Sequence, residues 1–256
     1  MRPGAAITKK RVGEITHPDG RKTPLVLLLR KDTSDEKVYR EIFAKEVYSK
    51  RPRGRGVLLT VSAGDVVLDL GAHVGCFAAY SLVKGAKKVV CYEADPENFA
   101  QLQKFIAYNR LGDMVTAHRA AVTNAPRKKT ISFYQNPKPG NSWRNSAQPT
   151  STKGWGKLTV PHNSFGKVLR DNRGATVIKL DIEGSEVDIL QSATIPRKVR
   201  LIVFEFTVRE GRRLPSIERN LKSAGLTMVA NTRAYKPHPS FKNYDELVFA
   251  YREGAV

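Results

Sequence analysis

Two acidic residues follow a short apolar run in the second half of the chain. The run Val177-Ile178-Lys179-Leu180 leads directly into Asp181-Ile182-Glu183-Gly184-Ser185-Glu186. A β-strand over the apolar residues would deliver Asp181 and Glu183 to the sheet edge where open α/β folds bind their ligands. A carboxylate there can accept a proton as a general base, or bind a divalent cation such as Mg²⁺ or Mn²⁺. Helix N-termini also favour acids, which is enough to explain Glu186.

A second group of residues has the pattern of a nucleotide-binding turn. A predicted strand ends in Asp69-Leu70-Gly71-Ala72-His73-Val74-Gly75, and a helix of small residues follows. Its two glycines permit positive φ and the close approach of backbone amides to a ligand. Glu93 ends the next predicted strand, where an acid accepts hydrogen bonds from ribose hydroxyls. The turn differs from the Gly-x-Gly-x-x-Gly pattern of dinucleotide-binding folds, because His73 stands at the position of the middle glycine and Asp69 precedes the turn.

The elements that must position these groups alternate along the chain. Apolar periodicity predicts strands at 66–70, 88–92, 115–118, 176–180, 201–206, 227–229 and 247–251, with helices at 76–83, from Asp95, from Ser185 and at 215–224. Alternation of this kind indicates a mostly parallel α/β sheet with helices on both faces. The carboxyl ends of its strands would bring the two groups of residues together.

Before this domain lies a basic lead-in. We divide the chain into an N-terminal extension with an entry helix (1–60) and an α/β domain (61–256) that carries a basic loop at about 125–160. In the extension we expect an irregular start, a strand at 24–29, and one helix with apolar positions at Val38, Ile42, Phe43 and Val47. A basic loop at 50–56 would follow it.

Several of these segments together resemble a known enzyme family. The segments 69–75, 92–96 and 178–186 look like the FkbM family of O-methyltransferases that use S-adenosylmethionine (SAM), and the residues 32–48 and 160–165 are also similar to that family. The resemblance implies a class I methyltransferase (Rossmann-like) fold with a mostly parallel seven-stranded sheet. It also implies SAM as cofactor and a hydroxyl, often on a sugar, as methyl acceptor.

The resemblance further implies roles for individual residues. The cofactor-binding set would comprise Asp69, Gly71, Ala72, His73 and Gly75 of the turn, Glu93 on the ribose, and Ala94, Ala121 and Val122 around the adenine. Asp181 is our first choice of general base, with Glu183 or Glu205 orienting the acceptor. Lys179 lies on the same strand face as Asp181 and is its expected ion partner. A divalent metal on Asp181 and Glu183 is an alternative that we do not favour.

Charge gives a separate indication about the acceptor. The net charge of +20 attracts polyanions, although it also promotes solubility whatever the protein binds. No acid occurs between Asp113 and Asp171, a stretch that holds both tryptophans and many cations. Cations contact phosphates and aromatic rings stack on bases, which favours single-stranded RNA. The expected contacts are Arg127, Lys128, Lys129, Trp143, Arg144, Trp155, Arg51 and Arg53. Alternatively, the tryptophans cover SAM or stack on a sugar ring.

The sequence therefore predicts a SAM-dependent O-methyltransferase that acts on a sugar hydroxyl, most simply the ribose 2′-O of RNA. A glycan or small-molecule sugar is the alternative acceptor, and a nucleic-acid-binding protein with a merely structural methyltransferase core is the non-enzyme alternative. The cysteines, Cys76 and Cys91, lie in predicted core elements, which indicates free thiols in a reducing intracellular compartment. We find no signal peptide and no apolar run long enough to span a membrane.

Overall fold

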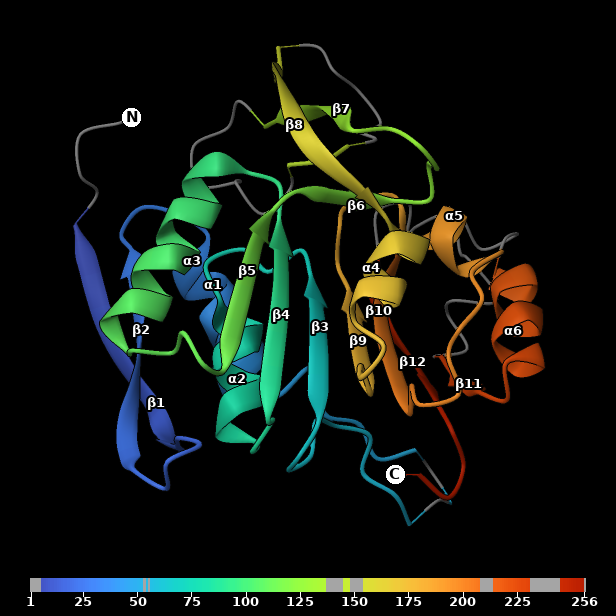
Figure 1. The fold of residues 1–256 in the computed structure, drawn as a ribbon, viewed down its shortest axis with the longest axis horizontal. Helices are drawn as coiled ribbons and strands as arrows, with labels where there is room; N and C mark the ends of the chain where they lie inside the picture. Colours follow the sequence, from blue (N-terminus) through green and yellow to red (C-terminus); the bar gives the residue numbers. More distant parts are fainter. Residues whose placement is uncertain are drawn as a thin grey trace.

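The centre of the protein is a seven-stranded sheet in the order β11-β12-β10-β9-β3-β4-β5 (Figure 1). A computed structural model describes residues 6–52, 54, 56–136, 145–147, 154–207, 214–230 and 245–255. The strands are β3 (Val66–Leu70), β4 (Lys88–Glu93), β5 (Val115–Arg119), β9 (Val177–Leu180), β10 (Leu201–Thr207), β11 (Thr227–Val229) and β12 (Asp245–Tyr251). Only β12 runs antiparallel to its neighbours β10 and β11. The predicted mostly parallel α/β sheet is confirmed.

Helices cover both faces of this sheet because alternate strand residues point to opposite sides. Val67 of β3 packs in one apolar cluster with α2 (Cys76–Val83) and α3 (Pro96–Tyr108), whereas the adjacent Leu68 packs in another. The second cluster includes α4 (Phe165–Asp171), α5 (Glu186–Leu190) and α6 (Leu214–Ser223). A strand that is buried on both faces needs a continuous apolar run, and this is the pattern from which the strands were predicted.

The lead-in contains a strand that the sequence analysis missed. β1 (Ile7–Thr16) pairs antiparallel with β2 (Lys22–Arg30) around a turn at residues 17–20. Only Ile15 of β1 is buried, so its side chains give no apolar run, and the strand exists through backbone pairing with β2. Leu25, Leu27 and Leu29 of β2 belong to the same apolar cluster as α2 and α3. The hairpin is therefore packed onto the domain.

The entry helix is shorter and less regular than predicted. Five α-helical residues, α1 (Asp35–Tyr39), are followed by a π-helical turn, η1 (Arg40–Ala44). The wider turn is closed by the bond from Lys45 N to Arg40 O at 3.0 Å. Because the helix ends at Ala44, Val47 lies outside it, in a turn closed by the bond from Ser49 N to Glu46 O.

A three-stranded sheet lies at the edge where β3, β4 and β9 end (Figure 1, top). It consists of β6 (Ala121–Thr123), β8 (Gly156–Ser164) and β7 (Thr130–Gln135), so much of the stretch expected as one basic loop is strand. β7 and β8, at the two ends of that stretch, were not predicted, because lysines, glycine and proline mask the alternation of Leu158, Val160 and His162, which point inward. In the described part of the chain, no helix has the length and apolarity needed to cross a membrane.

One ion pair fixes the start of the central strands. Asp65, which precedes β3, accepts two hydrogen bonds from the guanidinium of Arg200, which precedes β10, and one from the Thr176 hydroxyl before β9. Burial alone would raise the pKa of Asp65, but the bonds from Arg200, from the Ser62 amide and from Thr176 outweigh it and lower the pKa below its usual value. The ion pair and the Thr176 bond therefore link the starts of β3, β9 and β10, at the amino-terminal edge of the sheet.

We therefore predict that Arg200→Met lowers the free energy of unfolding by about 2–3 kcal/mol, because it leaves the Asp65 carboxylate buried without its charged partner. Urea unfolding monitored by circular dichroism measures this. Arg197→Met is the matched control, since Arg197 is exposed, and it should change stability by less than about 0.5 kcal/mol. Equal stabilities of the two variants would contradict this role.

Candidate active site

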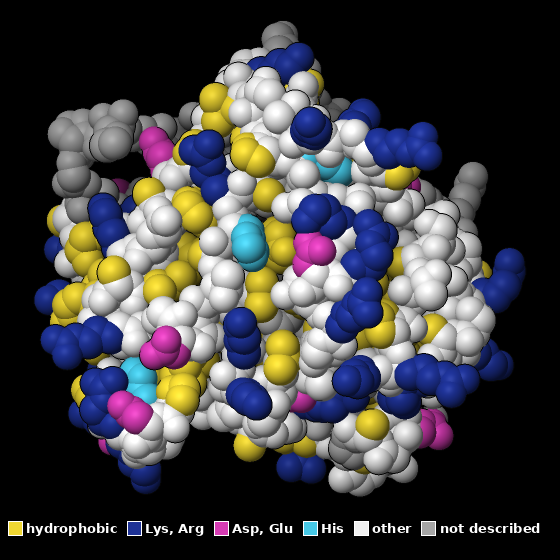
Figure 2. Space-filling model, in the orientation of Figure 1, with side chains coloured by type: hydrophobic (Ala, Val, Ile, Leu, Met, Phe, Trp, Pro, Cys, Tyr) yellow, Lys and Arg dark blue, Asp and Glu magenta, His cyan; other side chains and the backbone are white. Residues whose placement is uncertain are grey.

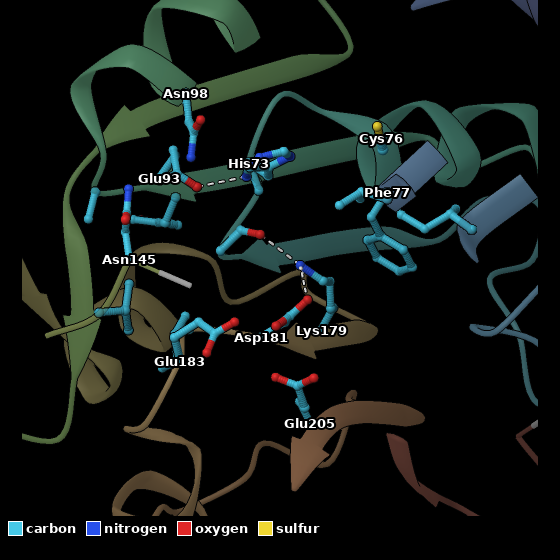
Figure 3. A pocket seen from close by; sticks show the side chains of 18 of the residues that line it. His73, Cys76, Phe77, Glu93, Asn98, Asn145, Lys179, Asp181, Glu183 and Glu205 are labelled. Atoms are coloured by element: carbon cyan, nitrogen blue, oxygen red, sulfur yellow. Dashed lines mark hydrogen bonds and ion pairs between the residues drawn. The ribbon is translucent and has the colours of Figure 1, made fainter. Parts of the chain in front are cut away.

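A cavity of about 310 Å³ lies at the carboxyl edge of the central sheet, at the ends of β3, β4, β9 and β10 (Figure 3). Parallel α/β sheets bind ligands at this edge, as the sequence analysis anticipated. The cavity walls come from segments far apart along the chain, among them the entry helix region, the turn after β3, the start of α2, the end of β4, β6 with β7, and the ends of β9 and β10. Most of the predicted cofactor and catalytic residues line it.

The turn after β3 requires its glycines for packing. Gly71 has φ +85°, and a Cβ there would lie 1.8 Å from the carbonyl oxygen of Asp181. A Cβ on Gly75 would lie 2.9 Å from the side chains of Leu102 and Phe105. These contacts bring the turn directly against the end of β9 and against α3. Gly71, Ala72 and His73 consequently line the cavity, whereas Gly75 does not.

Behind this turn lies a buried ion pair. Lys179 Nζ is 3.2 Å from Asp69 Oδ1, and both side chains are almost completely buried. The same ammonium donates to the Gly71 carbonyl at 2.7 Å and lies 3.5 Å from Asp181 Oδ2. Burial lowers the pKa of Lys179, but the charges of Asp69 and Asp181 outweigh burial and raise it. Burial raises the pKa of Asp69, against the opposing effect of Lys179.

Lys179 therefore carries a positive charge between the ends of β3 and β9. The strand alternation correctly placed Lys179 beside Asp181, but Asp69 is its nearer partner. That contact follows from the register, in which Asp69 and Lys179 are opposite each other on neighbouring strands. Asp69 does not line the cavity, so its carboxylate acts on the site through Lys179.

At the other end of the cavity, Glu93 is held by the backbone. Its carboxylate accepts hydrogen bonds from His73 N at 2.7 Å and Asp95 N at 2.8 Å, and it is 7% exposed. Desolvation raises the pKa of Glu93 to about 7 despite these bonds. Each carboxylate oxygen can accept a further hydrogen bond. Burial also lowers the pKa of His73 to about 4, so its imidazole is neutral.

Three carboxylates converge near Lys179. One oxygen from each of Asp181, Glu183 and Glu205 lies within 4.8 Å of the others, and all three side chains are half-buried (Figure 3). Groups in this arrangement can accept protons and hydrogen bonds from hydroxyls, or bind a divalent cation through oxygen. This convergence was expected from the sequence because each acid ends or follows a predicted strand.

Two supporting residues were missed. Glu186 is buried, and its carboxylate accepts bonds from Ile182 N at 2.6 Å and Gly184 N at 2.8 Å, so it shapes the turn that carries Glu183. Tyr48, from the lead-in, donates to Asp181 Oδ2 at 3.1 Å. Glu186 matched a simpler pattern, the acid at a helix N-terminus, and no local spacing connects residue 48 with residue 181.

Comparison with known proteins decides the class of this site. The family model described as the Methyltransferase FkbM domain matches residues 69–228, which is more than half of the chain. The chain belongs to the FkbM methyltransferase family. The match includes Asp69, Glu93 and Asp181, so the resemblance inferred from the sequence is confirmed. Comparison with curated proteins found no match.

Solved structures are similar to this FkbM-family chain at low identity. They include the FkbM methyltransferase from Methylobacillus flagellatus KT (18% identity, 87% of this chain and 56% of that chain, TM-score 0.46). Another is M. jannaschii TYW2 in complex with AdoMet (10% identity, 98% of this chain and 87% of that chain, TM-score 0.44). A third is precorrin-6y C5,15-methyltransferase from Geobacter metallireducens GS-15 (13% identity, 87% of this chain and 92% of that chain, TM-score 0.42). The chain spans little more than half the length of the Methylobacillus structure.

The chain carries an FkbM methyltransferase domain on a class I-type sheet, and SAM is the cofactor expected for this methyltransferase family. The cavity fits the cofactor's parts. Glu93 offers two acceptor oxygens for a ribose diol, and an apolar wall of small side chains, Ala94, Ala121 and Val122, leaves room for a flat base. Gly71 and Ala72 bring backbone to the cavity on the side of Asp181. These residues would hold the adenosine at one end and direct the sulfur toward the carboxylates.

Those predicted RNA contacts that the structure describes lie outside the cavity. Arg127, Lys128 and Lys129 are exposed in the turn between β6 and β7, Arg51 is exposed before β3, and Trp155 is half-buried beside β8. None of them lines the cavity, although Lys128 borders a second hollow on the three-stranded sheet. Arg53, Trp143 and Arg144 fall outside the described residues.

We expect the raised pKa of Glu93 to make SAM binding pH-dependent. Ribose hydroxyls donate to an ionised carboxylate, and Glu93 becomes protonated as the pH falls through about 7. We predict that the Kd for SAM rises about tenfold between pH 8 and pH 6, and that Glu93→Gln binds weakly with little pH dependence. Isothermal titration calorimetry measures both quantities.

Glu97→Gln is the matched control, because Glu97 is an exposed acid close by on α3. It should retain the affinity and pH dependence of the unmodified protein, including any contribution from titration of SAM itself. If Glu93→Gln follows the same curve as Glu97→Gln, Glu93 does not bind the ribose.

Proposed function

We propose that this methyltransferase transfers its methyl group to a sugar hydroxyl, the ribose 2′-O of RNA, with Asp181 as general base. The observation that carries the proposal is the Asp181 carboxylate. It lines the cavity, it is held by Lys179, and Glu183 and Glu205 lie beside it. An aliphatic hydroxyl is a weak nucleophile, and a positioned carboxylate removes its proton as the new bond forms.

Each residue of this group would have a separate role in methyl transfer. Asp181 accepts the proton of the attacking hydroxyl, and Lys179 stabilises the negative charge of Asp181 before transfer. Glu183 and Glu205 accept hydrogen bonds from neighbouring hydroxyls, which orients the sugar. When bound, SAM supplies a methyl group on a positively charged sulfur. The remaining contribution of the protein is to hold the two reactants in line, since proximity and orientation account for much of such a barrier.

The choice of RNA rests on charge. Lys and Arg side chains are spread over the face seen in Figure 2, with fewer acids among them, and the whole chain carries +20. Arg127, Lys128 and Lys129 lie on one turn of the three-stranded sheet, the sheet that also contributes Ala121, Val122 and Phe133 to the cavity. A strand bound along such a surface gains affinity from its phosphates.

A glycan or small-molecule sugar is the second candidate, and a specific observation favours it. Asp181, Glu183 and Glu205 form a cluster of carboxylates in the cavity, and Glu41 also lines the cavity. Carboxylates accept hydrogen bonds from the vicinal hydroxyls of any sugar, with no need for phosphate. A divalent cation on Asp181, Glu183 and Glu205 would be a further use of the same oxygens.

The two acceptors can be distinguished in one assay. We predict that radiolabelled SAM transfers its methyl to short single-stranded RNA at low salt, and that replacing every ribose by 2′-deoxyribose abolishes transfer. Asp181→Asn should lower the rate at least 100-fold, because the amide cannot accept the proton, while the Kd for SAM changes less than threefold. Asp171→Asn, at an exposed acid of α4, is the control.

Labelling of a glycan panel, with none of RNA, would reject RNA as acceptor while leaving sugar O-methylation standing. Full activity of Asp181→Asn on either acceptor would remove Asp181 from the mechanism. Methylation of a base or of the deoxyribose strand would show that the product is not a ribose ether.

A further inference from the structure

Part of the active site comes from chain that precedes the family match. Residues 38–48 contribute Val38, Glu41, Ile42, Lys45, Val47 and Tyr48 to the cavity wall, whereas the match begins at residue 69. The π-helical turn and the segment after it bring these side chains opposite the end of β9. Of the six, Tyr48 is the one whose hydroxyl donates to Asp181.

The position of Tyr48 is firmly set. Its ring is 6% exposed and packs on the ring of Phe77, with centroids 4.6 Å apart at an angle of 57°. Immediately after it, Lys50 and Leu59 form a two-way backbone bridge. The Ser49 hydroxyl is 2.8 Å from the Tyr80 hydroxyl on α2. Packing and these bonds leave the Tyr48 hydroxyl little freedom, so its direction is a property of the fold.

The hydroxyl of Tyr48 and the ammonium of Lys179 approach the same oxygen of Asp181. Tyr48 donates to Oδ2 at 3.1 Å, and Lys179 Nζ lies 3.5 Å from Oδ2. Among the described residues, no side-chain bond is made to Oδ1. Two donors on one oxygen fix the rotation of the carboxylate and leave the other oxygen for a substrate proton.

Tyr48 is suited to donating throughout the working pH range. Burial, and then the negative charge of Asp181, raises the pKa of Tyr48 well above its usual value of 10. The phenol therefore keeps its proton and remains a donor to the carboxylate. It does not compete with Asp181 as a base.

We propose that Tyr48 is a positioning residue for Asp181: with Lys179 it holds Oδ2, so that Oδ1 faces the acceptor hydroxyl. The idea rests on the proposed role of Asp181 as general base. It makes the lead-in a working part of the active site, since the turn that follows the entry helix supplies a group that acts on the reacting carboxylate. It also distinguishes Tyr48 from an aromatic that only fills space against Phe77.

Tyr48→Phe tests this, because it removes the hydroxyl and keeps the ring. We expect kcat to fall at least tenfold, with the KM for SAM and for the methylated acceptor changed less than twofold. In an Asp181→Asn background the same substitution should change residual kcat less than twofold, because the two residues act as one unit. Tyr39→Phe is the control, since Tyr39 is a lead-in tyrosine that stacks on Phe43 and does not line the cavity.

A second readout needs no acceptor. In protein labelled with [13Cγ]aspartate, the Asp181 carboxylate resonance is the one that disappears in Asp181→Asn. We expect it to move in Tyr48→Phe and to stay in place in Tyr39→Phe, with SAM affinity unchanged in both. An unmoved resonance would overturn the proposal, and so would a moved resonance with unchanged kcat.

These outcomes separate the two proposals. If the unmodified protein methylates no RNA or sugar, the proposed function fails, and the resonance still decides whether Tyr48 holds Asp181. If transfer is normal in Tyr48→Phe, the proposed function stands and the positioning role is lost.

Discussion

The ammonium of Lys179 is the charge on which the site depends. It lies where water does not reach, and three groups from the ends of two strands compensate for the cost of burying it: the Asp69 carboxylate, the Gly71 carbonyl and the Asp181 carboxylate. Because these groups belong to β3, to the turn after it and to the residue that follows β9, one cation joins the turn that we assign to the cofactor to the carboxylate that we propose as general base. Gly71 allows this approach, since any side chain there would collide with the Asp181 carbonyl.

Around this cation, carboxylates have two different functions. Glu93 and Glu186 are buried and accept backbone N–H bonds, so they shape the turns that border the cavity, although Glu93 also keeps acceptor capacity toward it. Asp181 instead receives side-chain donors on one oxygen, and no side chain of the described residues donates to the other, which suits a group that takes up a proton. Environment rather than residue type therefore separates structural acids from those available for chemistry.

Much of this arrangement could be predicted because it is local in sequence. The strand ends at Asp69, Glu93 and Asp181 follow from apolar runs that end in acids, and parallel strands bring such ends to one edge. What could not be predicted depends on contacts between distant segments. β1 has almost no apolar face and forms by pairing with β2, and β7 and β8 were hidden by basic and turn-forming residues. The hydrogen bond from Tyr48 to Asp181 joins residues 133 positions apart, so no local sequence pattern predicts it.

The central claim is that one cavity binds SAM with its ribose on Glu93 and its sulfur toward Asp181. A crystal structure with S-adenosylhomocysteine, the product that lacks the methyl group, tests it most directly. The account predicts both ribose hydroxyls within hydrogen-bond distance of the Glu93 carboxylate, the adenine against Ala121 and Val122, and the sulfur on the side of the cavity where Asp181 lies. A ribose bound instead by Asp181, Glu183 and Glu205, or adenosine bound outside this cavity, would contradict it.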